Sequence, residues 1–189
     1  MPAIASLPDA NVRSSSYYVA RTRVRCPYCG LSTRLLALAM PQGHETLQVD
    51  DDSEADSRAD AGAGADAGVD THGRDDPGPA VWQRENANAL LFYVESLPGV
   101  VQDRLQYLSP FYRLGFDAGT KNSYWANHCE HCAALLGDHE LHCEPEGAFL
   151  PASETAATHI RLLEISEPFA AAAAGYACDP EFFAFMRKD

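Results

Sequence analysis

Two pairs of cysteines with the same spacing constrain this chain more than any other feature of its sequence. Cys26 and Cys29 form one Cys-x-x-Cys pair, and Cys129 and Cys132 form the other. A tight Cys-x-x-Cys turn directs both sulfur atoms to one side, at the separation that two ligands of one tetrahedral metal ion need. Because one pair fills only half of a four-ligand shell, we expect the two pairs to meet in the fold and to bind one structural Zn²⁺.

Residues 30–128 lie between the two pairs, a longer separation than in most zinc-binding sequences. This length does not prevent the pairs from meeting, because the entropic cost of closing a loop grows only with the logarithm of its length. The local sequence favours a tight turn at the first pair, where Pro27 stiffens the chain and Gly30 allows it to reverse sharply. After the second pair, Ala133 occupies the position of that glycine.

Two other uses of these cysteines are compatible with the sequence. Cys-Pro-Tyr-Cys is also a dithiol motif of glutaredoxin-like redox proteins, in which Cys26 would follow a strand as the nucleophile and Cys29 would begin a helix. Alternatively, the metal would have a mixed shell of cysteine and histidine ligands. The nearby groups able to replace a cysteine ligand are His128, His131, His142 and Cys143.

Residues 26–30 and 129–132 resemble the knuckles of zinc-ribbon proteins, which are short turns that each hold two metal ligands. The resemblance covers only the segments around the two cysteine pairs. It implies one structural zinc ion, and it implies little about activity because zinc ribbons serve many functions.

The net charge of −13 is concentrated in one segment of the chain. Residues 50–76 contain ten acidic residues and two arginines, a net charge of −8, which leaves −5 for the rest of the chain. Because residues 50–79 consist mainly of Asp, Ala, Gly and Ser and contain no aromatic residue, we expect them to form a disordered acidic loop. A negatively charged body is also a poor electrostatic match for nucleic acid. We interpret the alternating Arg21, Arg23 and Arg25 as a solvated strand face.

The sequence predicts a cytoplasmic protein that does not enter a membrane. No apolar run approaches the roughly 18–20 residues of a membrane-spanning helix. The first residues lack a basic segment followed by an apolar stretch, as a secretory signal would have. In the cytosol, six cysteines are expected to be reduced or bound to metal rather than joined in disulfides.

Alternation of β-branched and aromatic residues indicates a chain rich in strands. Strands are predicted at 17–25, 33–40, 44–49, 81–83, 89–95, 121–127 and 160–165. The first two would form a hairpin around the first cysteine pair, and the strand at 121–127 would lead directly into the second pair. A flexible arm is expected over residues 1–16, and a hydrophobic turn region over residues 111–116.

Helices are predicted in three short segments. Val100, Val101, Leu105 and Leu108 recur at helical spacing and predict a helix over 99–108. The alanine-rich segment 169–174 is helical by propensity, ended by Gly175, and a helical turn is expected within 180–186.

Residues 138–144 contain side chains that are able to perform acid–base chemistry. If this segment is a strand, Asp138, Glu140 and His142 project from one face. A metal-assisted hydrolase built around His139, Glu140 and His142 is therefore an alternative to a purely structural role. The spacing of the two histidines is one residue too short for the His-Glu-x-x-His motif of metalloproteases.

These observations together predict an α+β fold, mostly antiparallel β-structure, with one zinc-organised domain over residues 17–189 that the acidic loop 50–79 interrupts. The site is a structural four-cysteine zinc site formed by Cys26, Cys29, Cys129 and Cys132, and no catalytic residue is assigned. We expect a non-catalytic interaction or adaptor module whose partner is another protein. The alternatives are the thiol redox protein and the metal-assisted hydrolase.

Overall fold

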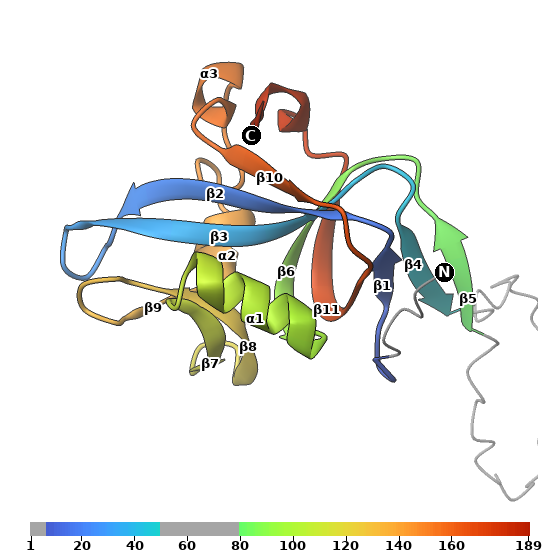
Figure 1. The fold of residues 1–189 in the computed structure, drawn as a ribbon. Coiled ribbons are helices and arrows are strands. Elements are labelled where there is room, and N and C mark those ends of the chain that lie inside the picture. Colours follow the sequence, from blue (N-terminus) through green and yellow to red (C-terminus); the bar gives the residue numbers. More distant parts are fainter. Residues whose placement is uncertain (1–6, 50–79) are drawn as a thin grey trace, which may run out of the picture.

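The computed structural model describes residues 7–49 and 80–189, and these residues form mostly antiparallel β-structure, as the sequence predicts. Nine strands form one sheet in the order β12-β10-β2-β3-β6-β11-β1-β4-β5, and three form a second sheet in the order β7-β8-β9 (Figure 1). The strands of the large sheet are β1 (Val12–Ser14), β2 (Tyr17–Arg25), β3 (Ser32–Met40), β4 (Glu45–Val49), β5 (Ala80–Arg84), β6 (Ala89–Ser96), β10 (Arg161–Ile165), β11 (Phe169–Cys178) and β12 (Arg187–Lys188). The small sheet contains β7 (Tyr112–Asp117), β8 (Asn122–His128) and β9 (Leu135–Leu136). The helices are α1 (Gly99–Leu108), α2 (Asp138–His142), α3 (Glu154–Ala157) and the 3-10 turn η1 (Phe183–Phe185).

The long hairpin of β2 and β3 dominates the molecule (Figure 1). The two strands pair without interruption from Tyr18 opposite Ala39 to Arg25 opposite Ser32. The first cysteine pair lies in the turn that joins them, so the predicted hairpin around this pair is confirmed. The strand predicted before the second pair is also confirmed, because β8 ends at His128 and Cys129 follows it directly.

Alternation along β2 and β3 divides the buried side chains into two cores, one on each face of the sheet. Val19, Leu36 and Leu38 pack on one face together with Val101 and Leu105 of α1. The opposite face carries a second core, which includes Ala20, Leu35, Ala37, Cys26, Cys129, Leu141, Phe149, Ile160 and Phe183. Figure 1 shows α1 and the small sheet on one side of the hairpin, and α3 and the C-terminal segment on the other.

A buried amide joins the small sheet to β3, in addition to the packing of β8 on β6, where the ring centroids of Tyr93 and Tyr124 lie 5.1 Å apart. Strand β3 pairs with β6 only from Leu38 to Met40, so the part of this edge nearer the cysteines forms no ladder with another described strand. There the side chain of Asn127 from β8 replaces a strand: its Oδ1 accepts from the Leu36 N–H (2.8 Å) and its Nδ2 donates to the Leu36 carbonyl (2.9 Å). This pair of bonds fixes the end of β8 against β3, one residue before His128 and two before the second cysteine pair.

The alanine-rich segment predicted as a helix is a strand, and this prediction is wrong. β11 pairs with β6 along most of its length and with β1 at its start, as in the register of Ala171 with Val12. Phe169 and the alanines that follow it as far as Ala173 are buried in the sheet. Tertiary pairing therefore overrides the intrinsic helix preference of alanine, and Gly175 lies within the strand instead of ending a helix.

Three further elements differ from the expectations. Val12–Ser14 forms β1 between β11 and β4, inside the segment expected to be a flexible arm over 1–16. The turn region expected at 111–116 is mainly the strand β7, which pairs with β8. Residues 138–142 form the short helix α2 rather than a strand, because they follow directly after β9 and turn back toward β6, where Asp138 accepts from the Tyr93 N–H (2.7 Å).

The acidic loop expected at 50–79 lies outside the described residues. Within the described parts of the chain, no helix has both the length and the apolar character needed to cross a membrane.

Gly175 provides a test of the β11–β6 pairing. It lies opposite Phe92, and a Cβ atom at this position would come within 2.1 Å of Phe92 Cε2. We expect Gly175→Ala to lower the free energy of unfolding by about 1–3 kcal/mol, because the Phe92 ring would have to leave its packed position. Denaturant unfolding measures this, and in a Phe92→Ala background the same substitution should cost much less. An equal cost in both backgrounds would contradict the contact.

Candidate metal centre

The fold brings the two cysteine pairs to one point at the end of the β2–β3 hairpin. The Sγ atoms of Cys26, Cys29, Cys129 and Cys132 all lie within 4.8 Å of one another. Cys26 and Cys129 are buried, whereas Cys29 and Cys132 are exposed. The four cysteines could thus hold a metal ion, with half of the cluster facing the core and half facing solvent.

Two sulfur–sulfur separations in the cluster have the length expected in a tetrahedral metal site. Cys26 Sγ lies 3.8 Å from Cys132 Sγ, and Cys29 Sγ lies 3.6 Å from Cys129 Sγ. A metal–sulfur bond of about 2.3 Å gives a tetrahedron whose sulfur atoms are about 3.8 Å apart. Sulfur atoms in a disulfide are separated by only about 2.05 Å, and all six cysteines of the chain are free thiols. The residues present therefore fit one tetrahedral ion.

The two cysteine turns have the same backbone structure, although their sequences differ. In the first, the Cys26 N–H donates to the Leu31 carbonyl and the Gly30 N–H donates to the Cys26 carbonyl, both at 2.9 Å. In the second, the Cys129 N–H donates to the Ala134 carbonyl (2.9 Å) and the Ala133 N–H to the Cys129 carbonyl (3.0 Å). Gly30 has φ of +74° and Ala133 has φ of +58°, so both occupy the left-handed region. The alanine at the glycine position thus adopts the knuckle conformation despite its Cβ.

Polar contacts hold the second turn against the start of β3. The Glu130 carboxylate accepts from Arg34 Nε (2.6 Å) and from the Arg34 backbone N–H (3.0 Å). The Glu130 N–H donates to the buried Thr33 hydroxyl at 3.0 Å, and His131 Nε2 lies 3.0 Å from the Ser32 carbonyl oxygen. Sequence reasoning missed these partners, because nothing in the chain near Glu130 indicates that residues 32–34 lie beside it.

Electrostatics in the cluster favour a bound cation. Burial raises the pKa of Cys129, but the backbone N–H groups of Cys132 and His131 and the thiols of Cys26 and Cys132 outweigh it and lower this pKa to about 6. The Leu31 N–H lowers the pKa of Cys29, but desolvation and the neighbouring thiols raise it to about 12. One thiolate forms readily and the next is disfavoured, so four thiolates at this spacing require a compensating positive charge.

The structure removes the geometric basis of the redox alternative. Cys26 follows β2, as that alternative requires, but Cys29 does not begin a helix. A turn follows it, and then β3 starts at Ser32. The helix dipole that would activate a thiol in a glutaredoxin-like site is thus missing from this part of the chain.

The histidines and the extra cysteine considered as replacement ligands lie outside the cluster of four thiols. His128 is buried with its Nδ1 3.1 Å from the Ala126 carbonyl oxygen, and burial is the main cause of its lowered pKa. The His131 imidazole is held by a hydrogen bond between its Nε2 and the Ser32 carbonyl oxygen. His142 stacks on Phe149 with ring centroids 5.0 Å apart, and the next residue, Cys143, is exposed. Among the described residues, the group that could hold a metal ion therefore consists of cysteines alone.

The residues proposed for a hydrolase do not converge on one site. Helix α2 directs His142 into the core, between the rings of Phe92 and Phe149, while His139 and Glu140 are exposed. Burial lowers the pKa of His142 to about 3, so this imidazole stays neutral and has no charged form to use near neutral pH. Burial raises the pKa of Asp138 to about 7, and its carboxylate is bound by the Tyr93 N–H.

The structure is that of an α+β protein with a cluster of four cysteines that could hold a metal ion. No protein-family model matches the chain, and the searches of curated proteins and of solved structures found no similar protein.

The two equivalent turns predict opposite effects of exchanging glycine and alanine. Gly30→Ala should lower the free energy of unfolding by about 1 kcal/mol, although an added Cβ meets no atom within 4 Å, because only the left-handed backbone is strained. Ala133→Gly should relieve the same strain and raise stability by up to about 1 kcal/mol. Denaturant unfolding of the protein as purified checks both. Changes of the same sign would show that the two turns are not equivalent.

Burial of His142 predicts a loss of stability in acid. Its pKa is about 3 in the folded protein and about 6.5 in an unfolded chain, so below pH 6.5 only the unfolded state takes up the proton. From pH 7 to pH 5 the wild type should lose about 2 kcal/mol relative to His142→Phe, whose ring keeps the stacking but does not titrate. The quantity to measure is the difference in unfolding free energy between the two proteins. A difference that does not change with pH would contradict the assignment.

Proposed function

We propose that this protein binds one Zn²⁺ through Cys26, Cys29, Cys129 and Cys132, and that the ion has a structural role. The observation that carries this proposal is the pair of Sγ–Sγ distances, 3.6 and 3.8 Å, at the edge length of a tetrahedron of thiolates. Four thiolates select zinc or iron among biological metals, and structural zinc sites are the closed four-ligand type. A reducing compartment such as the cytosol keeps these thiols available for the metal.

A structural role follows from the position of the cluster. The ion would join the tip of the β2–β3 hairpin to the end of β8, two elements that are otherwise connected by the Asn127 amide and the contacts of Glu130. Four protein ligands fill the shell, so no position is open for a substrate or an activated water molecule. Metal binding would then contribute directly to the free energy of folding.

Beyond the metal, we propose that the protein acts as an interaction or adaptor module whose partner is another protein. Large apolar side chains are exposed on two surfaces that are suitable for contacts. Tyr28, at 71% exposure, and Leu31 project from the first cysteine turn, and Leu114 and Phe116 share one face of the edge strand β7. Exposed apolar groups on an unpaired strand edge are features of protein-binding surfaces.

Native mass spectrometry before and after treatment with a strong chelator tests the metal proposal. We expect one zinc ion per chain, and its removal should be accompanied by loss of folded structure in circular dichroism. Cys129→Ser should remove the ion and unfold or aggregate the protein, because Cys129 is the buried ligand in the second turn.

Cys143→Ser is the matched control, since Cys143 is a free thiol outside the cluster, and this variant should keep both the ion and the stability. Bound iron in place of zinc, or a soluble Cys129→Ser protein with an unchanged melting temperature, would overturn the proposal. A chain two daltons lighter that gains this mass back with a reductant would instead support a Cys26–Cys29 disulfide and the redox alternative.

A further inference from the structure

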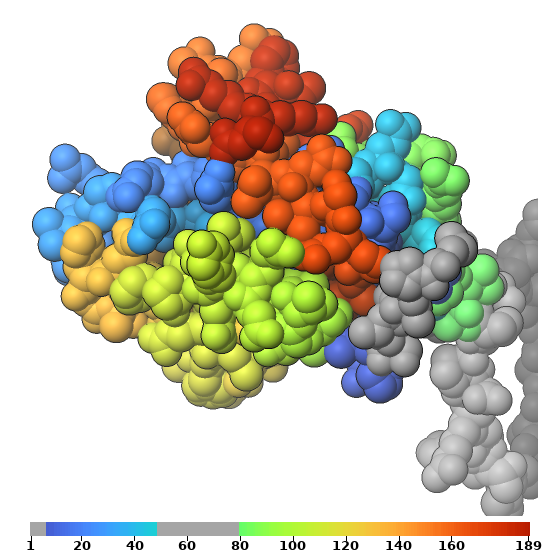
Figure 2. Space-filling model, in the orientation of Figure 1, coloured from blue at the N-terminus to red at the C-terminus, as the bar shows by residue number. Residues whose placement is uncertain are grey.

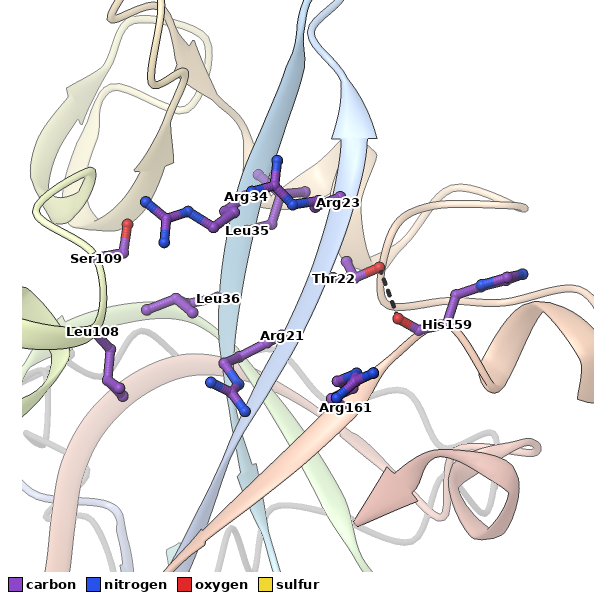
Figure 3. A pocket seen from close by; sticks show the side chains of 10 residues that line it. All are labelled: Arg21, Thr22, Arg23, Arg34, Leu35, Leu36, Leu108, Ser109, His159 and Arg161. Carbon is purple, nitrogen blue, oxygen red and sulfur yellow. Dashed lines mark hydrogen bonds between the residues drawn. The ribbon is translucent and has the colours of Figure 1, made fainter. Parts of the chain in front are cut away.

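We propose that a cavity beside the β2–β3 hairpin binds the phosphate group of a small organic phosphate. The cavity has a volume of about 500 Å³, within the range of small-molecule sites. Four arginines line it, from β2, β3 and β10 (Figure 3). The four cysteines are not part of its lining, so this inference goes beyond the structural role proposed for the metal.

The strand register places all four arginines on one face of the sheet. Arg21 of β2 lies directly opposite Arg161 of β10, and Arg23 of β2 lies directly opposite Arg34 of β3. Residues that face each other across antiparallel strands project from the same side, with Cβ atoms about 5 Å apart. Arg21 and Arg23 are two residues apart on one strand and therefore share that side as well. This is the face that carries α1, because Leu36, opposite Arg21, belongs to the α1 core.

The two opposed arginine pairs place like charges directly across the sheet, and carboxylates offset only part of their repulsion. Like charges directly across a sheet repel each other and reduce stability. Such an arrangement stands out in a chain whose net charge is −13. Bound negative charge would relieve the repulsion, and this makes the arrangement favourable in a binding site.

The charges around the cavity are only partly balanced within the described residues. Glu130 pairs with Arg34, and Asp189 pairs with both Arg21 and Arg161. Arg23 forms no ion pair with any residue that the structure describes, and the Nε of Arg21 is buried without a hydrogen-bond partner. Among the described ion pairs, four guanidinium groups meet two side-chain carboxylates, which leaves a surplus of two positive charges.

A phosphate monoester matches this surplus better than a carboxylate does. Its charge at neutral pH is about −1.5 to −2, and its three oxygens accept the paired N–H groups of guanidinium forks. The cavity also offers apolar contacts, because Leu36 and Leu108 line it next to the arginines. Beyond Arg21, β10 no longer pairs with β2, and the cavity continues around this edge of β2. There the Thr22 hydroxyl donates to the His159 carbonyl (3.4 Å; Figure 3). An organic phosphate of nucleotide size would use both the charge and the apolar wall.

Arg23→Gln is the most direct variant, and Arg25→Gln is its matched control. Both substitutions remove one positive charge from the same face of β2, but only Arg23 lines the cavity. We would titrate the whole chain as purified with inorganic phosphate, pyrophosphate, adenosine 5′-monophosphate and adenosine in an isothermal calorimeter, and compare a phosphoserine peptide. The wild type and Arg25→Gln should bind the phosphate-containing probes and not adenosine, and Arg23→Gln should bind them at least tenfold more weakly.

A second measurement separates loss of binding from loss of structure. Arg23→Gln should be at least as stable as the wild type without ligand, because its repulsion with Arg34 is removed, and its metal content should be unchanged. Failure of all phosphate probes to bind would overturn the inference, as would equal weakening by Arg23→Gln and Arg25→Gln. Binding of a phosphoserine peptide without binding of the small phosphates would also overturn it, in favour of a peptide site. Each of these results leaves the metal proposal intact, because metal content is measured separately.

Discussion

The meeting of four sulfur atoms at one point is the constraint on which the rest of this structure depends. The β2–β3 hairpin and the end of β8 come from distant parts of the sequence, and their tips must lie within 4.8 Å at the sulfur atoms. The Asn127 amide fixes the height of β8 along β3, and the contacts of Glu130 with Arg34 and the Thr33 hydroxyl fix its rotation. Without a cation, the pKa of Cys129 is lowered to about 6 and that of Cys29 is raised to about 12. One thiol therefore ionises readily, but ionisation of all four is opposed. Binding of a metal ion to the four thiols would therefore be coupled to this closure.

The same closure supports the arginine-lined cavity. Near its start, β2 is apolar on both faces, with Val19 in one core and Ala20 in the other. From Arg21 onward the α1 face becomes basic while the hairpin continues to the cysteine turn. Because β10 ends its pairing with β2 at Arg21, the cysteine cluster and its polar contacts hold this distal part together with the Thr22–His159 hydrogen bond and the packing of Val24 on the second core. Arg34 belongs to both regions, because it lines the cavity and binds Glu130 of the second turn.

The parts of the fold that follow from local chemistry could be predicted from the sequence. Turn residues and alternating or helical spacing act over a few residues, so the hairpin and α1 could be predicted. The cysteine cluster could be predicted because one Cys-x-x-Cys pair fills only half of a four-ligand shell. Local preference alone does not predict the second turn. Alanine disfavours the left-handed region, yet Ala133 adopts it within the hydrogen bonds of the turn. The strand at 169–178 could not be predicted from local sequence, because its alanines form a strand only through pairing with β6 and β1. The helix α2 and the strand β1 were missed for the same reason.

The arginine cavity shows why a net charge is a weak guide to local function. The acidic residues that dominate the total are concentrated at 50–76, whereas the cavity is defined by cross-strand neighbours that only a register reveals. Charges separated by more than about 8 Å are largely screened at physiological ionic strength, so a ligand in the cavity responds mainly to the nearest guanidinium and carboxylate groups. A chain that is strongly acidic overall therefore presents a locally basic site. By itself, the alternation of Arg21, Arg23 and Arg25 indicates a solvated strand face. The register adds Arg161 opposite Arg21 and Arg34 opposite Arg23, and these four residues line the cavity.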